Sequence, residues 1–231
     1  MAQQTQQVHQ LYDKFLKDMA EHHAEELPGL AFMEVRFKIL SAQLDKELIL
    51  RSRQVDTVML VRTKRGRQIL HLEFKTKYNR QELRKIFGYA GALTLKYRLD
   101  VTTILYLVRP PSKRAGDLGL YQAMPFGVPT NQFAFRVVRL WELHDAILAG
   151  DKRLTAWVPL LLELVEKPDI THLHRQRELI RLEEDPVRRA ELYYYTLAFA
   201  QRHFSQHFLR SFFKENNGRI LGIRSDFRRS Y

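Results

Sequence analysis

The sequence contains no cysteine among its 231 residues. A disulfide-stapled secreted scaffold, a thiolate metal site and a cysteine nucleophile are therefore excluded. Long hydrophobic runs are also missing. The longest apolar stretches, 101–108 and 156–165, are far shorter than the roughly 20 residues that span a bilayer, and Pro159 and Glu163 interrupt the second. Residues 1–7 are polar and uncharged and do not have the pattern of a signal peptide. We therefore expect a soluble cytoplasmic protein without a membrane partner.

Acidic residues are scarce relative to basic ones. The chain has 38 Lys and Arg against 26 Asp and Glu, which leaves a formal net charge of +12. Such an excess indicates a polyanionic partner, and nucleic acid is the first candidate. Hydrophobic residues make up 45% of the chain and aromatic residues 11%, so it can bury a sizeable core.

Hydrophobic periodicity predicts helices and strands in alternation, without an internal repeat or a low-complexity tract. Pro28-Gly29 is expected to end the first helix. In chain order we expect a helix over 5–23, a strand over 32–39, a hairpin of strands 54–62 and 68–75, a helix over 80–97, a buried and partly parallel strand over 101–108, a long loop over 110–131, an edge strand over 133–140, and helical segments near 141–149, 155–166, 172–184 and 187–214.

This order predicts an α/β fold with a mixed central sheet flanked by helices, followed by a helical C-terminal extension. We place the α/β domain at 1–140. The extension then covers 141–231 and includes a basic tail from Asn216 onward.

Two carboxylates are expected to meet in the hairpin. If Lys64-Arg65 is the centre of the turn, Asp56 lies opposite Glu73. Carboxylates opposite each other on neighbouring strands repel unless a cation lies between them. Hard divalent cations such as Mg²⁺ bind carboxylate and carbonyl oxygens.

Glu73 and Lys75 are two residues apart and share a strand face. The lysine can therefore orient or help deprotonate a water and counter charge on a phosphate. The other face, which carries Leu70, Leu72 and Phe74, is predicted to be core. The alternative is a solvent-facing Glu-x-Lys in which Asp56 and Lys75 form an ordinary surface ion pair.

Basic residues surround these carboxylates. Between positions 62 and 85 only Glu73 and Glu82 oppose them, so this segment has a net charge of +7. An anionic metal site inside a cationic collar is the arrangement that phosphate binding requires. The basic residues of the collar are Arg62, Lys64, Arg65, Arg67, Lys75, Lys77, Arg80, Arg84 and Lys85. The first four, at the hairpin tip, either contact a nucleic-acid groove or only solubilise an exposed turn.

Asp56, followed by Glu73-Phe74-Lys75 at the end of the next strand and then by a basic helix, resembles the PD-(D/E)XK nuclease superfamily. The expected helix-strand-strand-strand-helix-strand order is similar to its restriction-endonuclease-like core. The chain is most similar to the Rpn family of recombination-promoting nucleases, also described as candidate transposases. The matching segments are 12–17 in the first helix, 55–58 and 70–75 in the hairpin, and 84–89 in the following helix, with a looser likeness at 140–143.

The resemblance implies a role for each matching residue. Asp56 and Glu73 would hold Mg²⁺, or Mn²⁺ as a substitute, with the Phe74 carbonyl as a third ligand, and Lys75 would be the catalytic lysine. Residues implied to bind DNA are Lys77, Arg80, Arg84, Lys85 and Tyr89. Val55 stands where the superfamily's name has Pro, and many Rpn-like sequences have Gln at the position of Lys75.

The superfamily often adds an acid from the first helix, for which Asp13 and Glu34 are available. Asp13 also forms an ordinary i, i+4 pair with Lys17. His203 and His207 have the spacing of two ligands on one helix face, but a surface or DNA-facing pair explains them more simply.

His71 shares the face of Glu73, where a fully hydrogen-bonded strand histidine is favoured over an acid–base role. The aromatic residues of the late helix could stack on bases, but their spacing favours core. They are Tyr193, Tyr194, Tyr195, Phe199, Phe204, Phe208, Phe212 and Phe213.

Taken together, these residues predict a Mg²⁺-dependent DNA endonuclease, which the resemblance connects with recombination or transposition. Two alternatives stay open. One is a nucleic-acid-binding or regulatory protein that keeps the fold but does not cleave; the other is an interaction subunit that needs a partner. A two-fold homodimer would suit staggered cutting of duplex DNA.

Overall fold

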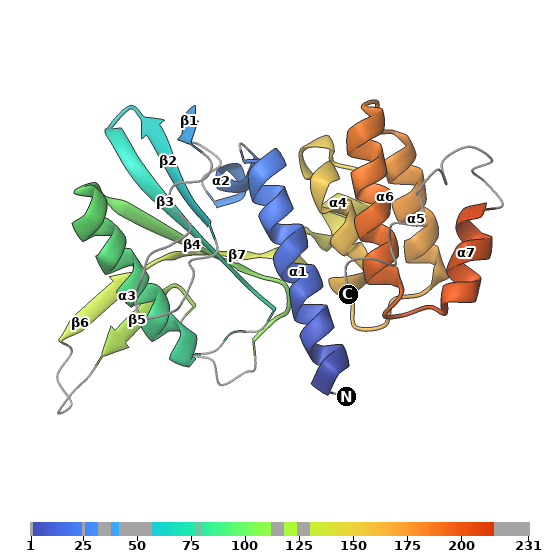
Figure 1. Cartoon of the computed structure of the whole chain (residues 1–231), viewed down its shortest axis with the longest axis horizontal. Coiled ribbons are helices and arrows are strands. Elements are labelled where there is room, and N and C mark those ends of the chain that lie inside the picture. Colours follow the sequence, from blue (N-terminus) through green and yellow to red (C-terminus); the bar gives the residue numbers. More distant parts are fainter. Residues whose placement is uncertain are drawn as a thin grey trace.

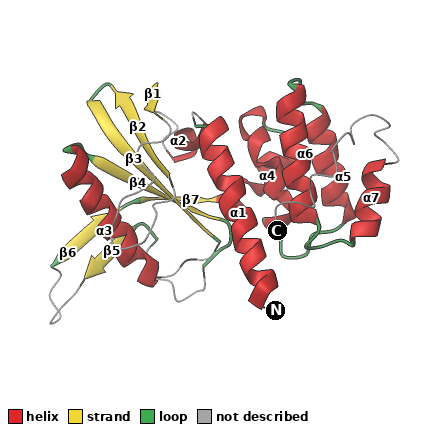
Figure 2. Cartoon of the chain, viewed as in Figure 1, coloured by secondary structure: helices red, strands yellow, loops and turns green. Residues whose placement is uncertain are grey.

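The computed structural model describes residues 2–24, 26–31, 38–41, 57–76, 78, 80–111, 118–123 and 130–214. Its centre is a five-stranded mixed sheet of order β1-β2-β3-β4-β7, with helices on both faces and a helical region beside it (Figures 1 and 2). These strands are β1 (Lys38–Ser41), β2 (Thr57–Thr63), β3 (Gly66–Lys75), β4 (Val101–Leu107) and β7 (Arg136–Arg139). The predicted α/β class with a mixed, helix-flanked sheet is confirmed.

The remaining elements are a small two-stranded sheet and the helices. The small sheet pairs β5 (Leu120–Ala123) with β6 (Asn131–Ala134). The α-helices are α1 (Ala2–His22), α2 (Glu26–Ala31), α3 (Arg80–Tyr97), α4 (His144–Ala149), α5 (Ile170–Arg181), α6 (Pro186–Ala200) and α7 (Gln206–Lys214). Two 3₁₀ segments, η2 (Leu140–Leu143) and η3 (Lys152–Glu163), lie on either side of α4.

The β2–β3 hairpin has the predicted register. Its turn is Lys64-Arg65, and the antiparallel pairs run from Thr63 opposite Gly66 to Thr57 opposite Leu72, without a bulge. Gly66 has a φ of 107°, a conformation that residues with a Cβ rarely adopt, so glycine is required there. Asp56 itself lies outside the described residues.

Strand β4 lies in the interior of the sheet and runs parallel to both of its neighbours, as predicted. Its residues pair with β3 from Ile69–Val101 to Lys75–Leu107, and with β7 from Ile104–Arg136 to Leu107–Arg139. A parallel connection requires a crossover, which α3 supplies between β3 and β4. Strand β7 is then the edge of the sheet.

The two faces of the sheet are covered by different helices (Figure 1). On one face, Val58 and Ile69 pack with Tyr89 and Leu93 of α3. On the other face, Leu70 and Leu72 join a larger core, and Phe74 packs against it, so the predicted core face of β3 is confirmed. Residues 71, 73 and 75 of β3 alternate with these and therefore face the side of α3.

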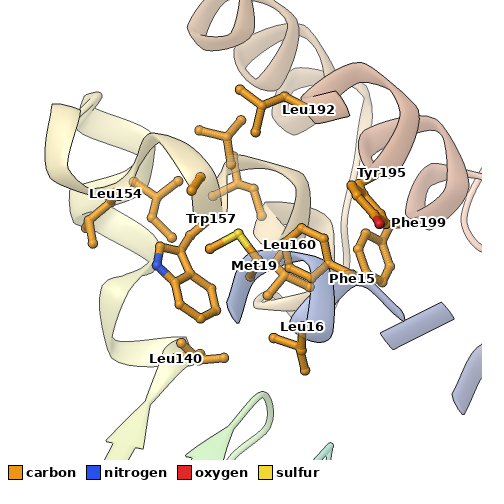
Figure 3. Packing of buried hydrophobic residues seen from close by; sticks show 14 of the residues in the cluster. Phe15, Leu16, Met19, Leu140, Leu154, Trp157, Leu160, Leu192, Tyr195 and Phe199 are labelled. Carbon is orange, nitrogen blue, oxygen red and sulfur yellow. The ribbon is translucent and has the colours of Figure 1, made fainter. Parts of the chain in front are cut away.

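Helix α1 lies between the sheet and the C-terminal helices and joins them in one core (Figures 1 and 3). The buried residues of α1 repeat at helical spacing and form one stripe. Phe15 meets Tyr195 and Phe199 of α6 with ring centroids 4.9 and 5.3 Å apart, both edge to face. Trp157 of η3 stacks 6.0 Å from Tyr106 of β4. The late aromatic residues are thus core, as favoured above, and the large core holds residues from both sides of position 140.

Pro28-Gly29 does not end a helix as expected. Helix α1 stops at His22, and Pro28 and Gly29 lie inside α2. Pro28 is the third residue of α2, where the backbone N–H would have no intrahelical acceptor, so proline is tolerated there.

Three later expectations are corrected as well. The expected loop over 110–131 contains β5. The single strand expected over 133–140 is divided between β6 and β7, because Phe135 lies between them and donates its backbone N–H to the carbonyl of Gly119. The helix over 187–214 is interrupted after Ala200. Residues 201–205 form turns before α7 begins at Gln206.

No helix in the described part of the chain has the length and apolar character needed to cross a membrane. The boundary at position 140 and the cytoplasmic location stay predictions.

Phe15→Ala tests the contact between α1 and α6. Because Phe15 is 1% exposed, its truncation should lower the free energy of unfolding by about 3–5 kcal/mol, measured by urea denaturation. Leu95 is 82% exposed, so Leu95→Ala should change it by less than about 0.5 kcal/mol. Equal effects of the two substitutions would show that α1 does not pack as described.

Candidate functional site

Three polar side chains of β3 form a cluster on the face that α3 covers. His71 Nε2 lies 3.0 Å from Glu73 Oε1, and Lys75 Nζ lies 3.0 Å from Glu73 Oε2. The predicted sharing of one face by Glu73 and Lys75 is confirmed. Both oxygens of one carboxylate are thus held by cationic or hydrogen-bonding partners from the same strand.

Glu73 is buried, with 2% of its surface exposed. Burial raises the pKa of its carboxyl, but the hydrogen bond with His71 and the positive charge of Lys75 outweigh this and hold the pKa below its ordinary value. The carboxylate is therefore ionised at neutral pH. The Lys75 side chain is 27% exposed, so it is partly accessible from solvent.

His71 is fully buried and has a partner at each ring nitrogen. Because an ionised carboxylate only accepts hydrogen bonds, Nε2 donates to Glu73. Nδ1 lies 3.2 Å from the hydroxyl of Thr103, which is the residue opposite His71 on β4. The ring also contacts Tyr89 edge to face, with centroids 6.1 Å apart. His71 is thus the fully hydrogen-bonded strand histidine favoured from the sequence, and it orients Glu73.

The second predicted carboxylate, Asp56, lies outside the described residues, as do Lys77 and Glu34. In the sequence Asp56 directly precedes Thr57, and Thr57 pairs with Leu72, the residue before Glu73. Within the described residues no group of three His, Asp or Glu side chains could hold a metal ion. The donors that are described, the ionised carboxylate of Glu73 and the backbone carbonyl of Phe74, are the hard oxygen ligands that Mg²⁺ takes.

The predicted nucleic-acid contacts on α3 have different surroundings. Arg84 is exposed, and its Nε lies 3.4 Å from the hydroxyl of Tyr121 in β5. Lys85 pairs with Glu82 on the same helix. Tyr89 is buried against His71. Arg80 is the first residue of α3, and its side chain is outside the described part of the chain.

Asp13, the predicted additional acid, belongs to α1. This helix packs on the sheet face opposite to that of Glu73, as the burial of Phe15 and Leu16 in the larger core shows. The side chain of Asp13 is outside the described part of the structure.

A second buried carboxylate, Glu163 at the end of η3, was missed by the sequence interpretation. Its oxygens accept hydrogen bonds from Tyr12 of α1, from Arg109 after β4 at 3.3 Å, and from Arg202 and His203 after α6 at 2.5 and 3.0 Å. The sequence does contain a signal for it, a single acidic residue inside the apolar stretch 156–165. Such a residue is carried into the core by its neighbours, and a buried charge must be paired.

The prediction that His203 and His207 form a pair on one helix face is wrong. His203 lies in the turn after α6, whereas His207 belongs to α7, so the two do not share a helix face. His203 contacts Glu163 and His207 is exposed.

Comparison with protein-family models, with curated proteins and with solved structures found no match for this chain. The functional argument therefore depends on the geometry of the site itself.

His71→Ala should destabilise the protein, since Glu73 would stay buried with one partner fewer. We expect the free energy of unfolding at pH 7 to fall by about 1–3 kcal/mol, measured by urea denaturation. His207→Ala, at an exposed histidine, is the control and should change it by less than about 0.5 kcal/mol. A His71 variant as stable as this control would contradict the orienting role.

Glu163 should make stability depend on pH. Burial raises the pKa of its carboxyl, but its hydrogen bonds from His203 and Tyr12 and the charge of Arg202 hold that pKa below its ordinary value. The ionised form therefore stabilises the fold fully above the ordinary Glu pKa of about 4.3, and this contribution is lost as the pH falls through the lower, folded-state pKa.

Glu163→Gln should therefore be less stable than the parent at pH 7, and the difference should shrink as the pH falls below about 4. Urea denaturation of both proteins between pH 3 and 7 measures it. A difference that stays constant with pH would show that the charge of Glu163 does not stabilise the fold.

Proposed function

We propose that this chain is a Mg²⁺-dependent nuclease that hydrolyses DNA phosphodiester bonds, and that its sheet is a restriction-endonuclease-like core. The observation that carries the proposal is the ionised, buried Glu73, whose carboxylate lies 3.0 Å from the ammonium of Lys75, a partly exposed side chain. A carboxylate can hold the cation that metal-assisted phosphodiester hydrolysis uses, and a lysine beside it can stabilise negative charge on the phosphate.

The order of the elements supports this proposal. Helix α1, strands β1, β2 and β3, helix α3 and strand β4 follow one another as in the core that the superfamily resemblance implies, with α2 inserted after α1. Glu73 and Lys75 lie near the carboxyl end of β3, directly before the loop that leads to α3. Functional residues of α/β proteins commonly lie at this end of a strand.

In this proposal each residue of the cluster has one task. Glu73, the Phe74 carbonyl and Asp56 would hold Mg²⁺, which would supply positive charge to neutralise the phosphate and to lower the pKa of water. Lys75 orients the attacking water and stabilises negative charge that develops on the phosphate oxygens. His71 positions Glu73 and keeps it ionised through its hydrogen bond.

A second candidate, a nucleic-acid-binding protein that does not cleave, is favoured by a specific observation. Both oxygens of Glu73 already have partners, His71 and Lys75, which balance its charge in the absence of a metal ion. In that case the cluster would serve stability alone, and the basic residues would serve binding.

Nicking of supercoiled plasmid with Mg²⁺ and with EDTA tests the proposal. The parent should nick DNA only with Mg²⁺, and Glu73→Gln and Asp56→Asn should lose at least about 100-fold in rate, because each removes a charged ligand. Lys75→Ala should lose rate to a comparable extent, about 100-fold, while keeping its affinity for the cation. Glu82→Gln, on the neighbouring helix, is the control and should cleave like the parent.

Binding of the same variants to DNA in EDTA separates the two candidates. Removing the charge of Asp56 or Glu73 should leave the affinity unchanged or raise it, because repulsion between carboxylate and phosphate is relieved. If the parent binds DNA but does not cleave it, whichever divalent cation is added, the second candidate is supported. An Asp56→Asn variant that cleaves like the parent would overturn the assignment of the site.

A further inference from the structure

The hairpin end of the sheet carries a row of cations across three neighbouring strands. Lys38 of β1 lies opposite Arg62 of β2, and Arg62 lies opposite Arg67 of β3. Opposed residues point to the same side of a sheet, so the three side chains share one face, and all three are exposed. Lys64 and Arg65 add two exposed positive charges in the turn. We call Lys38, Arg62, Lys64, Arg65 and Arg67 the hairpin row.

Like charges directly opposite each other on paired strands destabilise a sheet. The hairpin row contains two such pairs in succession, and in the described part of the chain no ion pair joins any of its side chains to a carboxylate. Elsewhere the chain pairs its cations readily, as at Lys85–Glu82 and Arg175–Glu178. In the described part of the chain, the charges of the hairpin row are thus balanced by no acidic side chain.

The row and the candidate site lie on the same face of β3. Arg67, Ile69, His71 and Glu73 alternate with the core residues Leu70 and Leu72, and Ile69 packs against α3. Glu73 is six positions after Arg67, which at about 3.3 Å per residue corresponds to roughly 20 Å along the strand. Helix α3 packs on this face between them, so a duplex that meets both places must pass beside α3. One strand of duplex DNA rises about 3.4 Å per nucleotide, so such a duplex spans at least about six base pairs.

We propose that the hairpin row binds the sugar-phosphate backbone of a duplex, at least about six base pairs from the phosphodiester at Glu73. The site is distinct from the metal cluster and recognises phosphate rather than bases, because its side chains are lysine and arginine on an exposed sheet end. The identification of the polyanion as DNA rests on the proposed function. The cationic binding surface is argued independently of that function. The protein thus contacts a polymer at two places and does not act on isolated nucleotides alone.

Binding of a 24-base-pair duplex in EDTA, followed by fluorescence anisotropy over a range of salt concentrations, tests the row without any need for cleavage. The variant is Arg62→Gln with Arg67→Gln, and its matched control is Lys152→Gln with Lys167→Gln, two exposed lysines of the C-terminal part. The hairpin variant should bind at least about 10-fold more weakly, and its plot of log K against log salt should be flatter by about 1 for each lost phosphate contact. The control should match the parent.

Two further measurements separate a binding role from other causes. The urea midpoint of the hairpin variant should be no lower than that of the parent, since repulsion between Arg62 and Arg67 is relieved. Hydrolysis of bis(p-nitrophenyl) phosphate, a phosphodiester too small to reach the row, should be unchanged by the hairpin substitutions. If neither the parent nor the variants hydrolyse this substrate or plasmid DNA, the proposed nuclease activity is wrong. The binding measurement then still decides whether the hairpin row binds DNA.

Equal affinities of the hairpin and control variants would overturn the proposal and show that the row only solubilises the turn. The proposal would also be overturned if the parent bound phosphatidylserine vesicles more tightly than the duplex at the same salt concentration, and if the hairpin variant lost this vesicle binding. A lower urea midpoint of the hairpin variant would contradict the repulsion on which the argument depends.

Discussion

Burying an ionised carboxylate is the constraint on which most of this structure depends. Taking such a charge out of water costs several kcal/mol unless donors surround it, and the described part of the chain buries two, Glu73 and Glu163. The donors around Glu163 come from α1, from the segment after β4 and from the turn after α6. The positions of these elements are therefore coupled, since moving any one of them would leave a buried charge short of a partner.

The two carboxylates differ in what they can do. The side chain of Glu163 is wholly buried and held by four donors, and its role is structural. Glu73 lies near the end of a strand, and one of its partners, Lys75, is accessible from solvent. This contrast is the reason why the proposed function assigns the chemistry to Glu73 and not to Glu163.

In the hairpin row, charge weakens the fold instead of stabilising it. Lys38, Arg62 and Arg67 repel one another across β1, β2 and β3, although a neutral residue at any of these positions would relieve the strain. The fold tolerates this repulsion because the side chains are exposed, where water and salt screen it. A phosphate backbone beside these cations would turn the net electrostatic interaction from repulsive to attractive. The same residues that weaken the free protein would then stabilise its complex with DNA.

The sequence by itself determined the local features. Turn chemistry at Lys64-Arg65-Gly66 set the register of the hairpin, and alternation along β3 placed Glu73 and Lys75 on one face, because both depend on residues close in the chain. Long, strongly periodic segments such as α3 were predicted with correct bounds. Only the tertiary structure decided that Glu73 is buried, that Glu163 joins α1 to the C-terminal helices, and that the last helices separate after Ala200. These depend on contacts between residues as far as 190 positions apart, as for Arg202 and Tyr12, and no local pattern encodes such contacts.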